Sequence, residues 1–86
     1  MKYICVETED GKQEVITFPR TIDHDVMMEG LGRLKTSTQG NWERVWRIPV
    51  SAGFVTPDNN CHGESITLNL QSRPEDTEIL KNQMSW

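Results

Sequence analysis

The segment 2–18, KYICVETEDGKQEVITF, decides the fold of this chain. Its two ends, residues 2–8 and 13–18, are rich in the β-branched and aromatic side chains that favour β-strands. Between them stands Asp10-Gly11, a dipeptide favoured in tight hairpin turns. The segment therefore predicts a β-hairpin at the start of the chain.

A short helix is expected directly after this hairpin. Pro19 ends the second strand, and Thr21 or Asp23 can accept hydrogen bonds from the free N–H groups of a helix that begins near His24. Apolar residues at helical spacing follow, at Met27, Leu31 and Leu34. Two glycines inside this pattern each weaken the helix by about 1 kcal/mol relative to alanine, so the helix depends on tertiary packing.

The middle of the chain predicts a second hairpin. After the polar segment 36–41, which we expect to form a surface loop, the apolar residues fall on even positions, as in a strand with one apolar face: Trp42, Trp46, Ile48, Val50, Ala52 and Phe54. The same alternation returns after a turn at 56–60, at Ile66, Leu68 and Leu70. Pro49 and Gly53 indicate that the first strand lies at a sheet edge or is divided by a β-bulge.

The residues 72–75, SRPE, predict a C-terminal helix. Ser72 supplies a capping hydroxyl, Pro74 fits the first turn, and Glu75 stands three residues after the cap. The predicted order is therefore ββαββα. We expect a single small α+β domain over residues 1–86, in which two helices pack on one face of an antiparallel sheet.

Charge and cysteine content limit the classes of function. The 86 residues carry a net charge of −4, which argues against direct nucleic-acid binding as the main activity. The two cysteines lack the CxxC spacing, so we expect reduced thiols, no metal and no cofactor. No apolar run approaches the roughly 18 residues of a membrane span, so a cytoplasmic protein without a membrane partner is expected.

One set of side chains has the residue types of a metal or catalytic site, namely Asp23-His24-Asp25 together with Cys61-His62. The two groups lie far apart in sequence and lack a known ligand spacing, and helix capping already explains the first of them. Cys61 as nucleophile, His24 as base and Asp25 as orienting group would require a proximity that the sequence does not indicate. We expect no enzyme, and a Cys61-dependent enzyme remains an alternative.

The charges of the chain are unevenly distributed. Four basic residues oppose only Glu43 between positions 33 and 47, and they are Arg33, Lys35, Arg44 and Arg47. With Trp42 and Trp46 between them, this basic centre predicts a partner-binding surface and, as an alternative function, a small nucleic-acid-binding regulator. The even register favours core packing of the two tryptophans over base stacking.

A second predicted partner-binding surface lies at the end of the chain. Met84 and Trp86 extend the apolar side of the C-terminal helix beyond what its own packing uses. The core of so short a chain is thin, so a binding partner or a twofold homodimer is expected to cover this surface.

Several short motifs, in this order and spacing, carry a family resemblance over most of the chain. They are Phe18-Pro19 with Ile22-Asp23-His24, then Ser51-Ala52-Gly53-Phe54-Val55, Cys61-His62-Gly63-Glu64-Ser65, Leu68 and Ser72-Arg73-Pro74-Glu75-Asp76. The chain thereby resembles a family of small uncharacterised phage and prophage proteins. This resemblance implies the cytoplasm of a bacterial host cell, and it implies no catalytic residues. Small acidic phage proteins often bind a host protein, so we expect a non-enzymatic inhibitor of a host defence system, like those that block CRISPR effectors at a groove for nucleic acid.

Overall fold

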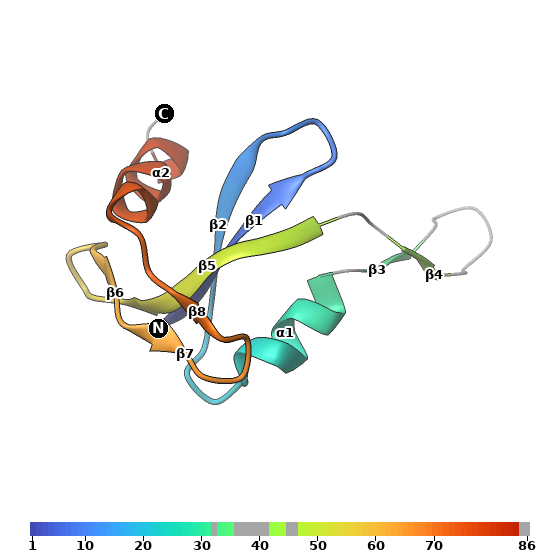
Figure 1. The fold of residues 1–86 in the computed structure, drawn as a ribbon, viewed down its shortest axis with the longest axis horizontal. Helices are drawn as coiled ribbons and strands as arrows, with labels where there is room; N and C mark the ends of the chain where they lie inside the picture. Colours follow the sequence, from blue (N-terminus) through green and yellow to red (C-terminus); the bar gives the residue numbers. More distant parts are fainter. Residues whose placement is uncertain (32, 36–41, 45–46, 85–86) are drawn as a thin grey trace.

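The computed structural model describes residues 1–31, 33–35, 42–44 and 47–84, and in the segments 33–35 and 42–44 it describes the backbone (Figure 1). The elements are β1 (Lys2–Thr8), β2 (Gln13–Phe18), α1 (His24–Leu31), β3 (Arg33–Lys35), β4 (Trp42–Arg44), β5 (Arg47–Val55), β6 (Cys61–His62), β7 (Glu64–Ser65), β8 (Leu70–Gln71) and α2 (Pro74–Met84). Every described strand pair is antiparallel, and two helices accompany the sheets. The predicted α+β class is confirmed.

The main sheet has four strands in the order β2-β1-β5-β6. Its first two strands form the predicted hairpin, in which Lys2 lies opposite Phe18 and Glu7 lies opposite Gln13. Gly11 adopts a φ of 82° in the connecting turn, a conformation that glycine reaches without strain. The sequence pattern was sufficient to predict this hairpin because both strands and their turn are contiguous in sequence.

Pro49 and Gly53 indicated an edge position or a bulge for their strand; β5 lies inside the sheet, and a β-bulge divides it. Cys5 of β1 lies opposite Ser51, whereas Val6 lies opposite Pro49, so Val50 is the extra residue of the bulge. The even-numbered residues of β5 point to one face of the sheet before the bulge and to the other face after it. The single apolar face predicted for this strand is therefore wrong, because Val50 packs on one face and Ala52 on the other.

The two helices cover opposite faces of the sheet, and this differs from the predicted packing on one face (Figure 1). One core cluster joins Tyr3 and Cys5 of β1 to Leu80 of α2. The other joins Ile4 and Val6 to apolar residues of α1, which are Met27, Met28 and Leu31. The physical reason is that β1 is buried on both faces, as its uninterrupted apolar run from Tyr3 to Val6 requires.

The second predicted hairpin is not formed as one long pair. β6 has only two residues, and after Gly63, at a φ of 81°, the chain turns away into the small hairpin β7–β8. Ser65 Oγ accepts a hydrogen bond from the N–H of Leu68 (3.3 Å), and Asn69 adopts a φ of 55°, which closes this hairpin. Ile66 is 87% exposed at its tip instead of lying on a strand.

Both helices begin where the sequence predicts, although two details differ. The carbonyl of Asp23 accepts the first helical hydrogen bond from Met27 (3.0 Å), and α1 ends at Leu31, so Leu34 belongs to β3. In α2 the capping residue is Arg73 instead of Ser72, because the Arg73 N–H donates to the Asp76 carboxylate (2.9 Å) three residues later. Ser72 uses its backbone N–H to bond the carbonyl of Gly63 (2.9 Å).

Candidate binding surfaces

A two-stranded ribbon, formed by β3 and β4, extends away from the four-stranded sheet (Figure 1). In its register Arg33 lies opposite Arg44, and Lys35 lies opposite Trp42. Residues that face each other across an antiparallel pair, or stand two apart on one strand, belong to the same face. Three basic positions and one tryptophan therefore share one face of this ribbon, which we call the basic ribbon.

The fourth basic residue of the predicted centre, Arg47, has a different place. It is half-buried at the start of β5, and its guanidinium donates to the carbonyl of Leu31 at the end of α1 (2.5 Å). A cation at the negative end of a helix dipole is stabilising. Arg47 therefore joins the end of α1 to the start of β5, and its buried Nε has no hydrogen-bond partner among the described residues.

The residues outside 33–47 form what we call the acidic body. Residues 33–47 hold four basic and one acidic side chain, whereas the rest of the chain holds five basic and twelve acidic ones. Such separation creates a local positive field that the net charge of −4 conceals.

The structure removes the main argument for placing Trp42 in the core. That argument placed Trp42 on one strand face with residues up to 54, but β4 pairs with β3, whereas β5 pairs with β1 and β6. Trp42 belongs to the two-stranded sheet and not to the four-stranded one. The predictions for Trp46 and for the loop 36–41 lie outside the described residues.

An apolar groove of about 570 Å³ lies between α2 and the adjacent end of the main sheet. Among the residues that line it are Val15, Val55, Pro57, Leu80 and Met84. Met84 is 50% exposed there, in agreement with the apolar surface predicted at the end of the chain. Trp86, the other residue of that prediction, lies outside the described residues.

A second groove, of about 520 Å³, is lined by rings. The rings of His24 and Phe54 are nearly perpendicular, with 6.0 Å between their centroids, and the centroids of Phe54 and His62 lie 6.1 Å apart. The fold thus brings together two histidines from the groups proposed as metal or catalytic residues. His24 is committed to structure, because its Nε2 donates to the Gly53 carbonyl (3.0 Å) and its ring is buried.

Cys61 does not join these histidines. It packs with Tyr3 and Leu80 on the α2 side of the sheet, whereas His24 contacts Phe18 on the α1 side. Burial raises the pKa of the Cys61 thiol, so its reactive thiolate is disfavoured. The described residues hold no group of three or more side chains suited to a metal ion.

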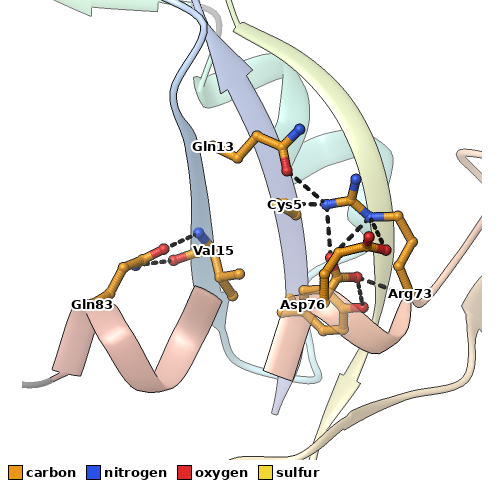
Figure 2. Close-up of polar contacts among 8 residues, drawn as sticks. Cys5, Gln13, Val15, Arg73, Asp76 and Gln83 are labelled. Carbon is orange, nitrogen blue, oxygen red and sulfur yellow. Dashed lines mark hydrogen bonds and ion pairs between the residues drawn. The ribbon is translucent and has the colours of Figure 1, made fainter. Parts of the chain in front are cut away.

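A polar network lies where α2 meets the sheet (Figure 2). Asp76, fully buried, accepts hydrogen bonds from the Tyr3 hydroxyl (2.5 Å) and from the Arg73 guanidinium (2.8 Å). Burial opposes ionisation of Asp76, but these bonds outweigh it, so the pKa of Asp76 lies below its ordinary value. The same burial, together with the bond to Asp76, raises the pKa of Tyr3.

Three further residues, Gln13, Cys5 and Ser51, surround this network, and of these Gln13 is exposed. Arg73 also donates to Gln13 (3.0 Å) and lies 3.4 Å from the Cys5 sulfur. The Ser51 hydroxyl lies close enough to lower the pKa of Asp76 but makes no regular hydrogen bond among the described residues. We interpret the network as structural, since it links the first strand to the last helix and lines none of the grooves above.

Comparison with protein-family models, with curated proteins and with solved structures finds no significant match to this chain. Neither of the two described helices combines the length and the apolar character of a transmembrane span.

Proposed function

We propose that this protein is a non-enzymatic nucleic-acid-binding protein that contacts its partner through the basic ribbon. One observation carries the proposal: the register of β3 and β4 gathers Arg33, Lys35, Arg44 and Trp42 on one face of a ribbon that stands away from the acidic body. Basic side chains neutralise phosphates, and aromatic side chains stack on bases.

The acidic body limits how such a complex forms. Twelve carboxylates against five basic groups repel a phosphate backbone, so contact is confined to the basic ribbon. With about three phosphates neutralised, the logarithm of the association constant should fall with the logarithm of salt concentration at a slope of about −2 to −3. Binding should therefore be of moderate strength and strongly dependent on salt.

The experiment is a fluorescence anisotropy titration of labelled oligonucleotides between about 50 and 200 mM KCl, the range over which counterion release is pronounced. The variant R33E/K35E/R44E should abolish binding. The control K12E/R20E reverses two exposed cations of the acidic body. It adds to the repulsion and should weaken binding, but far less than the ribbon variant does. Equal binding by the two variants would contradict the proposal.

A second candidate is the inhibitor of a host defence protein that the sequence resemblance implies. The apolar groove beside Met84 favours it, because exposed apolar surface often marks a protein contact, and the acidic body suits a basic groove on the partner. The variants separate the candidates: M84E should abolish binding of such a protein partner, while R33E/K35E/R44E should leave it intact.

A further inference from the structure

We infer, on the basis of the proposed function, that the basic ribbon takes single-stranded nucleic acid and that Trp42 provides the stacking position for an unpaired base. The juxtaposition that carries this inference is the register pair Lys35 and Trp42, next to the pair Arg33 and Arg44, on one face of the ribbon.

The spacing of these positions fits one nucleotide and its neighbours. Residues directly opposite each other in an antiparallel pair have Cβ atoms about 4.5–5.5 Å apart. A cationic position, Lys35, and an aromatic position, Trp42, therefore lie side by side. One can contact a phosphate while the other contacts the base of a neighbouring nucleotide. Arg33 and Arg44 lie two residues further along, about 7 Å away, where they extend the path for the backbone.

An aromatic position favours unpaired bases over a duplex. In a duplex the faces of the bases are covered by their neighbours, and only their edges are accessible in the grooves. Tryptophan offers one N–H donor to an edge, whereas its ring offers a full surface to an exposed base. Trp42 is therefore of most use to a single strand.

The distribution of charge in the protein also favours a single strand over a duplex. A duplex carries about one phosphate per 1.7 Å of its axis, which is twice the linear charge density of one of its strands. This higher charge density attracts the basic ribbon more strongly as well. A stiff duplex, however, cannot keep its phosphates at the ribbon alone and also brings them near the acidic body, which repels them with its twelve acidic against five basic residues. Glu43, on the ribbon face opposite Arg33 and Lys35, adds to this repulsion when phosphates surround the ribbon.

The test compares three labelled probes at one salt concentration: a 20-nucleotide oligo(dT), a 20-nucleotide oligo(rU) and a 20-base-pair DNA duplex. Both single strands should bind at least about tenfold more tightly than the duplex. The two single-stranded probes distinguish DNA from RNA as the source of the unpaired bases.

The contribution of stacking is measured with two variants. W42A should weaken single-strand binding by about 5- to 100-fold, as expected for the loss of one stacked base, and should leave duplex binding unchanged. W42F retains a ring and should keep most of the affinity. Thermal unfolding of both variants shows whether the fold is intact.

The outcomes separate this inference from the proposed function. Binding of the duplex as tightly as the single strands, or an equal effect of W42A on both, overturns the inference and leaves nucleic-acid binding standing. Absence of binding to all three probes overturns both.

Discussion

Gln83 of α2 bonds both backbone groups of Val15 in β2. Its side-chain nitrogen donates to the Val15 carbonyl (2.9 Å), and its side-chain oxygen accepts from the Val15 N–H (Figure 2). β2 is an edge strand of the main sheet, so these groups have no strand partner. The amide side chain of Gln83 thus makes the two hydrogen bonds that a neighbouring strand would make, and it fixes α2 to the β2 edge of the main sheet.

Replacing Gln83 by alanine should lower the free energy of unfolding by about 1–2 kcal/mol, because both Val15 groups lose their partner. In a domain of this size that corresponds to a fall in melting temperature of roughly 4–16 °C. Asn82→Ala, an exposed neighbour on the same helix, is the control and should change the melting temperature little. Equal effects of the two substitutions would show that the Gln83 bonds contribute nothing specific.

Asp76→Asn should lower the free energy of unfolding by about 1.5–3 kcal/mol, because the buried amide loses the charge-assisted hydrogen bonds that the carboxylate accepts. Exposed Glu78→Gln on the same helix is the control. Chemical denaturation at neutral pH measures both. A loss for Asp76→Asn no larger than that for Glu78→Gln would contradict a structural role for the network.

The lowered pKa of Asp76 also predicts a pH dependence. A carboxylate whose pKa is lower in the folded than in the unfolded state stabilises the fold above the unfolded value, and this stabilisation is lost as the pH falls further. The stability of the native chain should therefore decline below about pH 4, near the ordinary value of 3.8. Asp76→Asn should lack this part of the decline. An unchanged acid profile in the variant would assign the effect to other carboxylates.

Two glycine substitutions should have opposite effects. A Cβ at Gly53 would stand 2.3 Å from the carbonyl oxygen of His62, so Gly53→Ala must move β6 and should cost about 1–3 kcal/mol. At Gly30, in α1, nothing lies within 4 Å of the added atom. Gly30→Ala should therefore stabilise the chain by about 0.5–1 kcal/mol. Melting curves of the two variants that shift in the same direction would disprove this packing.

The two thiols should react slowly in the folded protein. Both cysteines are free, and burial raises the pKa of Cys5 and of Cys61 above the ordinary value of 9.0. Reaction with Ellman's reagent at pH 7.5 should be slower than that of free cysteine and should become fast in denaturant. A thiol that reacts rapidly under native conditions would revive the Cys61-dependent enzyme.

The sequence predicted those parts of the fold that are specified locally. The first hairpin and the start of each helix depend on contiguous signals, such as Asp10-Gly11 and Pro74, and they are confirmed. The second hairpin failed because alternation of apolar residues does not reveal the extra residue Val50 or the turn that ends β6 at Gly63. The bulge at Val50 and the turn at Gly63 both depend on the strand with which each segment pairs.

For the candidate surfaces, too, the sequence showed the local features but not the long-range ones. Clustering of Arg33, Lys35 and Arg44 was visible in the sequence, but their pairing in a separate ribbon was not, because the three-residue strands are too short to show a period. The Tyr3–Asp76 hydrogen bond joins residues 73 positions apart and has no local signal. The position of Asp76 in the first turn of α2 by itself indicates only a favourable interaction with the helix dipole.

The burial of β1 on both faces has a consequence for how this chain must fold. β1 precedes its partner β5, which begins at Arg47, and Leu80 of α2 completes the cluster with Tyr3 and Cys5. Contacts between such distant segments carry a high loop-closure cost and form slowly. During synthesis, therefore, the side of β1 that carries Tyr3 and Cys5 stays uncovered until Leu80 has left the ribosome, and its apolar surface is exposed to aggregation in that interval.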